Sequence, residues 1–113
     1  LFFLTTSGYN FDPSKLPLAH AQCMREFVKW VTFGREDVVV DNTNCTAVEI
    51  APYIAVTRAF GVEPEVVVLD TPVETCIERA QHGAPEFAIV RQHENLKTLL
   101  ETWPSYWPKY RKV

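Results

Sequence analysis

The sequence predicts an α/β fold, in which short parallel strands alternate with helices. Two β-branched runs, residues 38–41 and 65–70, each end in an acidic residue, and a helical pattern of about a dozen residues lies between them. A strand, a helix and a second strand, with both strands apolar throughout, are typical of a right-handed βαβ unit with parallel pairing. A stable sheet normally needs three or more strands. We therefore expect a further strand, either from residues 1–5 at one edge or from a segment that this chain lacks.

A long helix is expected in the first third of the chain. Residues 12–15, Asp-Pro-Ser-Lys, make a helix-start signal. Apolar side chains follow at helical spacing, at Leu16, Ala19, Cys23, Phe27 and Val31. The helix should run to about Thr32, with Gly34 just beyond its end, and a polar turn at residues 35–37 should lead into the first strand.

The second half of the chain carries three more helix signals. Thr46 and Glu49 fit a capping box, so a helix should begin at Ala47 and stop before Gly61, with Pro52 as a point of bending. Residues 71–74, Thr-Pro-Val-Glu, repeat the capping box with proline at the first helical position. The helices predicted here cover about residues 73–81 and, after the Gly-Ala-Pro break at 83–85, about residues 86–102.

Composition places the chain among ordinary globular proteins. Its 113 residues can form one domain with a modest core, and 47% are hydrophobic and 22% charged. A net charge of −3 argues against a global attraction to nucleic acid or to an anionic membrane. Three separated cysteines without a Cys-x-x-Cys pair argue against a disulfide framework and favour the cytoplasm or another reducing intracellular compartment. The apolar start at residues 1–4 is too short for a membrane segment.

Asp41 to Asn44 are the first candidate site. In open α/β sheets, ligands bind beyond the carboxyl ends of the parallel strands, where this acidic and amide-rich turn is expected. An aspartate there can hold Mg²⁺ directly or through water, and the neighbouring amides and hydroxyl can orient it. An equally open alternative is an Asx-rich turn that only caps the next helix.

Several separated motifs then resemble one family in the right order. They are Tyr9 to Pro13 with Leu16, Ala19 and His20, Val39 to Thr46, Glu49 to Tyr53, Arg79, and His82 to Pro85. Together they look like the AAA-type ATPases related to polynucleotide kinase and to the Nedd4-binding protein family. The resemblance implies a P-loop NTPase-like parallel sheet with flanking helices, use of ATP and Mg²⁺, and phosphoryl transfer to a 5′-hydroxyl of a polynucleotide or nucleoside.

The chain departs from that family in one important way. Nowhere does it contain a Gly-x-x-x-x-Gly-Lys-Ser/Thr loop, whose amides, lysine and hydroxyl would hold the phosphates and Mg²⁺. The resemblance implies that this strand-loop-helix segment and the general base would precede Leu1. We therefore expect residues 1–113 to form a single, partial kinase-like domain, its C-terminal two-thirds, with an aromatic and basic tail at 103–113.

The resemblance also assigns roles to individual residues. Asp41 would hold Mg²⁺ and take part in catalysis, and Asn42, Thr43 and Asn44 would shape the nucleotide loop. Arg79 would act from a lid as a catalytic and nucleotide-binding cation. His82 would contact phosphate, although a surface histidine before Gly83 is an equally open interpretation.

Two functions from different classes stay open. The chain is either part of an ATP-dependent phosphotransferase or a catalytically inactive fragment that serves as a structural or interaction module. Its expected partners are a nucleotide and, as a further candidate, a nucleic-acid 5′ end, but no membrane. The tail interleaves aromatic and basic residues, as single-stranded nucleic acid would require. A proline-broken tail of this kind more often packs on its own domain or on a partner.

Overall fold

The computed structural model describes residues 4–5, 8–9, 12–35, 37–80 and 83–113. The chain divides into two compact units, Leu1–Asp41 and Asn42–Val113. Within the described residues, no helix is long and apolar enough to cross a membrane.

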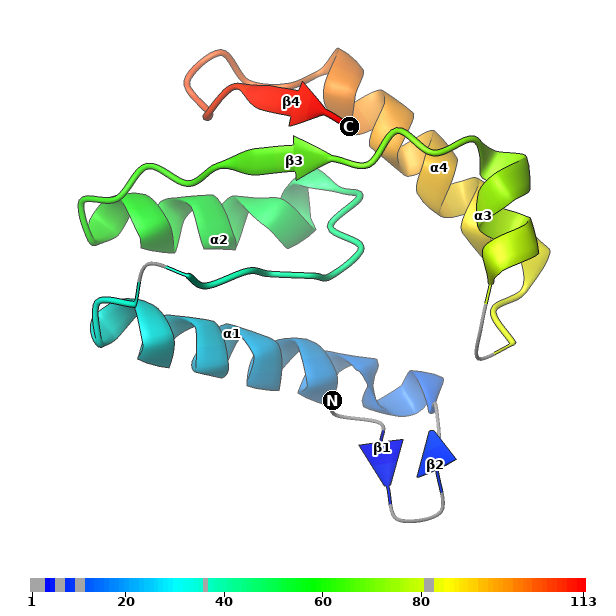
Figure 1. Cartoon of the computed structure of the whole chain (residues 1–113), viewed down its shortest axis with the longest axis horizontal. Coiled ribbons are helices and arrows are strands. Elements are labelled where there is room, and N and C mark those ends of the chain that lie inside the picture. The colour runs from blue at the N-terminus through cyan, green and yellow to red at the C-terminus, as the bar shows by residue number, and fades with distance from the viewer. Residues whose placement is uncertain (1–3, 6–7, 10–11, 36, 81–82) are drawn as a thin grey trace. The chain divides into compact units, whose positions relative to one another are not determined.

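The first unit contains a short hairpin and the long helix. Strands β1 (Leu4–Thr5) and β2 (Gly8–Tyr9) pair antiparallel, and η1 (Pro13–Lys15) leads into α1 (Leu16–Thr32) (Figure 1). The expectation that residues 1–5 form an edge of a parallel sheet is wrong for the described part of that segment. Its partner is the strand that follows at once, because closing so short a loop costs little entropy.

Local signals act at the C-terminal end of α1 and at the start of η1, which leads into it. Asp12 is the N-cap of η1, and its Oδ1 accepts hydrogen bonds from Ser14 N at 3.0 Å and Ser14 Oγ at 2.7 Å. The N-cap of α1 itself is Lys15, which makes no side-chain cap bond. At the other end, Arg35 N donates to Trp30 O and Gly34 N donates to Val31 O. These two bonds form a Schellman motif, and Gly34 supplies the left-handed conformation, with φ of 73°, that the motif requires.

Residues 38–41 do not form the predicted strand. The segment is extended, and Val38 and Val40 are half-buried while Val39 is 85% exposed, yet no ladder pairs it with any described residue. The alternation of burial has the period of a strand, but a β-branched run becomes a strand only where another backbone meets it in register. Asp41, which ends the segment, is exposed.

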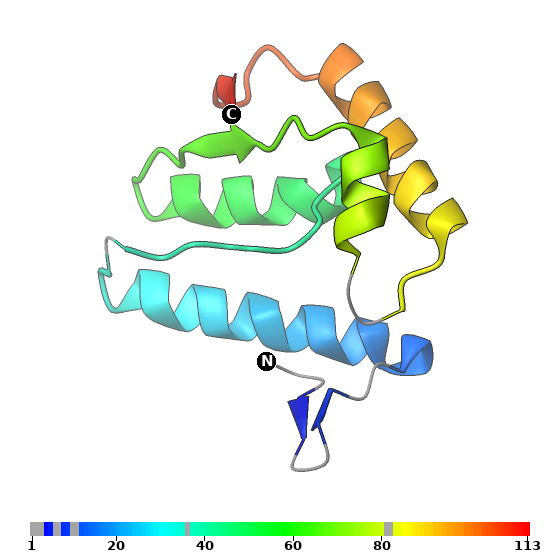
Figure 2. The same ribbon diagram turned by 45° about the vertical axis from the view of Figure 1, so that its right-hand side comes forward.

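The second unit has mixed helix and strand structure. Its elements are α2 (Ala47–Ala59), β3 (Val66–Val68), α3 (Val73–Arg79), α4 (Glu86–Glu101) and β4 (Tyr110–Lys112). Figure 1 and Figure 2 both show α2 running alongside β3, and α3 packs on α4. The small parallel sheet and the flanking helices are compatible with an α/β P-loop-like fold.

The parallel partner of β3 is β4, not residues 38–41. Val66, Val67 and Val68 lie opposite Tyr110, Arg111 and Lys112. Two further bonds extend the pairing, from Val113 N to Val68 O at 2.9 Å and from Asp70 N to Val113 O at 3.1 Å. The predicted strand at 65–70 is thus confirmed at its centre, but its crossover runs through α3 and α4.

The helix bounds in this unit follow the sequence signals, with one correction. Thr46 Oγ1 accepts from Glu49 N at 3.4 Å, and α2 ends before Gly61 as expected. The capping box predicted at residues 71–74 does not form, since Pro72 is the N-cap and no side chain bonds to the first turn of α3. A tertiary amide without a side-chain acceptor cannot fill that role. The end predicted at residue 81 lies outside the described residues.

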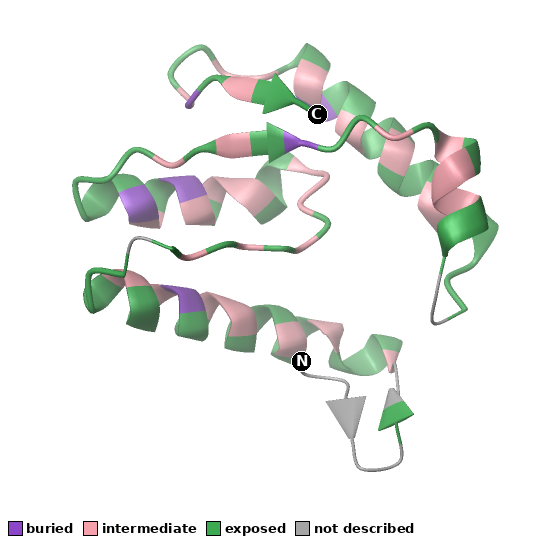
Figure 3. Cartoon of the chain, viewed as in Figure 1, coloured by how far each residue is buried: buried purple, intermediate pink, exposed green. Residues whose placement is uncertain are grey.

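Buried side chains are few. Among the described residues, Phe27 is buried in the first unit, and five residues are buried in the second (Figure 3): Ile54, Thr57, Val68, Leu99 and Pro108. Thr57 Oγ1 donates to Tyr53 O at 2.7 Å, so its buried hydroxyl is satisfied within α2. The core of the second unit therefore joins α2, β3, α4 and the tail.

The tail at residues 103–113 packs on its own unit. Trp103 Nε1 donates to Pro108 O at 2.9 Å, and the ring of Trp103 meets Trp107 and Tyr110 edge-on, each at 5.0 Å between centroids. Arg58 of α2 donates to the carbonyl of Tyr106. These contacts bring the last residues onto β3, as one of the two open interpretations of the tail expected.

Candidate functional site

Along the chain, the residues of the predicted site, Asp41 to Asn44, are divided between the two units. Asp41 is the last residue of the first unit, and Asn42 is the first residue of the second. The geometry of the loop can therefore be followed from Asn42 onward, on the N-terminal side of α2.

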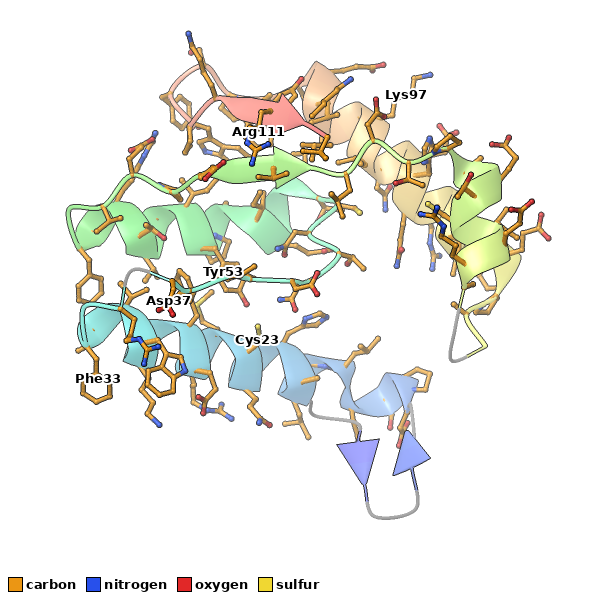
Figure 4. The ribbon with its side chains drawn as sticks, in the orientation of Figure 1. Cys23, Phe33, Asp37, Tyr53, Lys97 and Arg111 are labelled. Carbon is orange, nitrogen blue, oxygen red and sulfur yellow. The ribbon has the colours of Figure 1, made fainter. Side chains whose placement is uncertain are left out.

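Side chains of α2 hold this loop. Asn42 Nδ2 donates to Tyr53 Oη at 3.3 Å, and Tyr53 is labelled on α2 in Figure 4. Thr43 Oγ1 donates to Glu49 Oε2 at 3.5 Å, a long and weak bond, while Cys45 Sγ donates to Thr43 O at 3.2 Å. Two of these bonds hold the loop against the first half of α2, and the third lies within the loop.

Asn44 gives the loop its shape. Its φ of 45° makes it the one described non-glycine residue with left-handed backbone. Asparagine tolerates this conformation better than other residues with a Cβ, because its short amide can bond locally. The chain reverses at Asn44, and Thr46 then caps α2 with its hydroxyl. The cap therefore comes from Thr46, not from Asp41 or the asparagines.

The electrostatics of the loop are set by Glu49. Its carboxylate lies in the first turn of α2, where the helix dipole favours a negative charge. Burial, with a smaller contribution from the Glu49 charge, raises the pKa of the Cys45 thiol. Cys45 therefore stays protonated at neutral pH, and its chemistry is that of a weak donor within the loop rather than a nucleophile.

Asp41 offers one carboxylate to a Mg²⁺ ion, without a cluster of further protein ligands among the described residues. The described residues contain no group of three or more His, Cys, Asp or Glu side chains that could enclose a metal ion. Mg²⁺ does not require such a cage, since it is commonly held by one or two carboxylates, waters and the phosphates of a substrate. An exposed carboxylate at the start of a fixed loop fits that pattern.

Of the two predicted lid residues, Arg79 and His82, the structure describes only Arg79. Arg79 is the last residue of α3 and is exposed, and Ala80 caps the helix. In the described part of the chain no hydrogen bond or ion pair joins Arg79 to the loop at 42–44. His82 lies outside the described residues, so its predicted phosphate contact stays a prediction.

Sequence reasoning missed how the loop is supported. Glu49 was expected to close a capping box, and Tyr53 was expected only as part of a family motif. The signal was available, because residues four apart on a helix share a face. Glu49 and Tyr53 therefore present a carboxylate and a hydroxyl to the same loop.

Comparison with known families supports the coarse interpretation. A family model described as an AAA domain matches residues 8–101. The match runs from β2 to the end of α4 and stops before the aromatic tail. No solved structure matches the chain.

Proposed function

Because the chain belongs to the AAA domain family, we propose that it serves Mg²⁺-dependent nucleotide binding in a P-loop kinase-like domain. The finer proposal is an ATP-dependent phosphotransferase of the class that acts on a polynucleotide or nucleoside 5′-hydroxyl. The observation that carries the proposal is the fixed loop that follows Asp41. An exposed carboxylate comes directly before a turn in which the side chains of Asn42 and Thr43 bond to α2.

In this proposal each residue has a separate task. Asp41 contributes a carboxylate oxygen to the coordination of Mg²⁺, which neutralises charge on the phosphates when it is bound. Asn42 and Asn44 keep the turn in place through the Tyr53 bond and the left-handed backbone. Arg79 supplies a cation that can contact phosphate oxygens from the end of α3.

The same sequence limits the affinity expected of this chain. In P-loop sites most hydrogen bonds to phosphate come from a Gly-x-x-x-x-Gly-Lys-Ser/Thr loop, and the 113 residues contain no such pattern. We expect the purified chain to bind Mg²⁺-ATP more weakly than the micromolar range, which corresponds to about 8 kcal/mol. Saturable micromolar binding in a calorimetric titration would contradict this expectation.

The metal part of the proposal can be tested without activity. Mn²⁺ accepts the same oxygen ligands as Mg²⁺ and broadens nearby amide resonances. Added Mn²⁺ should broaden the amides of residues 41–46 first, and excess Mg²⁺ should reverse the effect. The Asp41→Asn variant should lose this selective broadening, because the amide keeps the shape of the side chain but not its charge.

A matched control separates this site from general attraction of cations. Asp70 is also an exposed aspartate that follows an apolar run, and it lies after β3. The Asp70→Asn variant should keep the broadening at 41–46, and so should Arg79→Gln, since a lid cation does not bind the metal. If Asp41→Asn and Asp70→Asn behave alike, the Mg²⁺ role of Asp41 is refuted.

Exposed apolar side chains favour a second function, that of an interaction module. Val48 on α2 is 85% exposed, and Leu69 after β3 and the terminal Val113 are 68% and 67% exposed. An interaction module would require such side chains to gather in one contiguous apolar patch. Absence of selective broadening at 41–46, together with concentration-dependent self-association in light scattering, would favour this function over nucleotide binding.

A further inference from the structure

An aromatic and cationic cluster at the end of α1 has no part in the proposed nucleotide site. The Nζ atom of Lys29 lies 5.0 Å from the centroid of the Trp30 ring, and the Cζ atom of Arg35 lies 5.5 Å from it. Phe33, labelled in Figure 4, meets Trp30 edge-on at 6.3 Å. One indole is therefore flanked by an ammonium, a guanidinium and a second aromatic ring.

The cluster borders an open depression. The depression has a volume of about 250 Å³ and is lined by Trp30, Arg35, Asp37, Val38 and Val39. All of these residues belong to the first unit. The depression is open to solvent, and its aliphatic lining comes from Val38 and Val39. A flat group can therefore enter from solvent and meet apolar as well as cationic atoms.

Asp37 holds the guanidinium in a fixed orientation. Arg35 Nε donates to Asp37 Oδ1 at 3.2 Å, and Arg35 Nη2 donates to Asp37 Oδ2 at 3.3 Å. These bonds raise the pKa of Arg35 and lower the pKa of Asp37, so the pair stays charged across the physiological range. The two-point contact keeps the guanidinium plane beside Trp30 before any ligand arrives.

Lys29 differs from Arg35 because it makes no ion pair with a described residue. Its ammonium lies at the C-terminal end of α1, next to the same ring. The cluster thus combines an indole and a guanidinium that is bonded to Asp37 with an ammonium that has charge available for an anion.

We propose that Trp30, Arg35 and Lys29 form a binding site for single-stranded nucleic acid, in which a base stacks in the depression and Lys29 contacts the adjoining phosphate. Bases stack on aromatic rings and on guanidinium planes alike, and neighbouring cations pair with the backbone. The proposal requires no ATP, no metal and no contact with residues of the second unit. It can therefore fail or succeed independently of the proposed nucleotide site.

The contacts of the tail favour this location over residues 103–113. There the rings of Trp103, Trp107 and Tyr110 pack on one another, and Trp103 bonds to Pro108, so these three rings serve the fold. Arg111, which Figure 4 labels, pairs with Glu65 at 2.8 Å. At the end of α1, Trp30 is 37% exposed and Phe33 is 67% exposed, so aromatic surface is available to a ligand.

Binding can be located without changing the sequence. The chain has three tryptophans, Trp30, Trp103 and Trp107. With 5-fluorotryptophan incorporated, an oligothymidine of about eight nucleotides, a typical site size, should shift the fluorine resonance of Trp30 in a saturable way in the presence of a metal chelator. The resonances of Trp103 and Trp107 should stay in place. No shift at Trp30, or equal shifts at all three, would overturn the proposal.

Stacking and charge can then be separated with a second ligand. An abasic oligonucleotide of the same length has the same phosphates but no bases. Measured by fluorescence anisotropy, Trp30→Ala should weaken binding of the oligothymidine roughly fivefold or more and change binding of the abasic strand less than about twofold. Equal losses for both strands would show that Trp30 does not stack on a base.

Lys29 should affect both strands, because it contacts phosphate. Lys29→Gln should weaken both and reduce the slope of log affinity against log salt by about one. Lys97→Gln is the matched control, since Lys97 is an exposed lysine on α4 in the other unit, and it should leave affinity and slope unchanged. If the two substitutions had equal effects, the binding would reflect a general attraction between positive charges and phosphates, and the proposed site would be refuted.

Discussion

The tail should be an integral part of the second unit, and the substitution Trp103→Phe tests this. Phenylalanine keeps a ring beside Trp107 and Tyr110 but removes the Nε1 donor that bonds to the carbonyl of Pro108 at 2.9 Å. Pro108 is buried, so its carbonyl loses a partner where water does not easily replace it. Leaving such an acceptor unsatisfied costs about 1–3 kcal/mol.

Urea unfolding followed by far-ultraviolet circular dichroism measures this cost. With a slope of about 1–3 kcal/mol/M for a small protein, a loss of about 2 kcal/mol lowers the midpoint by roughly 1 M. The matched control is Trp30→Phe, which makes the same chemical change at an exposed tryptophan of the first unit. That variant should stay within about 0.5 kcal/mol of the parent.

Hydrogen exchange locates the effect. The amides of Val113 and Asp70 donate in the pairing of β3 with β4, and Tyr110 of β4 packs on Trp103. Their protection should fall in Trp103→Phe and stay unchanged in Trp30→Phe. Equal midpoints for the two variants, or unchanged protection at both amides, would refute the view that Trp103 anchors β4.

Three further results are expected. Asn44→Gly should preserve stability within about 0.5 kcal/mol, whereas Asn44→Ala should lower it by about 1 kcal/mol in the same unfolding assay, because the φ of 45° suits glycine and disfavours alanine; equal stabilities would contradict the strain. Glu49→Gln should shift the pH profile of Cys45 alkylation to lower pH, since the Glu49 charge helps to raise the thiol pKa; an unchanged profile would leave burial as the only cause. The hydrogen bonds from Ser14 hold the pKa of Asp12 below its ordinary value, so the cap of η1 stabilises the protein above about pH 4 and is lost as the pH falls through the lowered pKa; exchange of the Ser14 amide should rise there, and Asp12→Asn should remove this pH dependence.

Helices were predictable because their signals are local. Thr46 and the two glycines after α1 and α2 act within one turn of the residues they affect, and the structure confirms those ends. Asp12 acts equally locally, on the short helix η1 that precedes α1. The predicted cap at Thr71 was wrong because proline became the cap itself, a competition that the pattern alone does not resolve.

Strand pairing was not predictable in the same way. The run at 65–70 was correctly identified as a strand, but its partner depends on which distant backbone reaches it. Glu65 and Arg111, which pair across the sheet, are 46 positions apart. The prolines at 104 and 108 indicate a loop, so the three-residue strand β4 was not predicted. The run at 38–41 is more apolar and was predicted as the partner strand instead.

In the candidate site, too, local features were predictable and contacts between distant residues were not. Its position after an apolar run could be predicted from residue types, and so could the need for polar side chains there. Whether Asn42 would bond to a ligand or to Tyr53 depends on the path of the loop over α2, which is fixed by the left-handed Asn44. Periodicity carries no information on that path.

The parallel pairing of β3 with β4 brings together the two ends of the chain segment that lies between these strands. Arg58 bonds to the carbonyl of Tyr106, 48 positions away, and Arg111 bonds to Glu65. The segment that contains α3 and α4 is therefore held at both of its ends by contacts around the small sheet. A single proteolytic cut near Gly83, between the two helices, would therefore leave both fragments held by the sheet and by helix packing. The second unit is thus suited to reassembly from two separately produced halves, divided at that glycine.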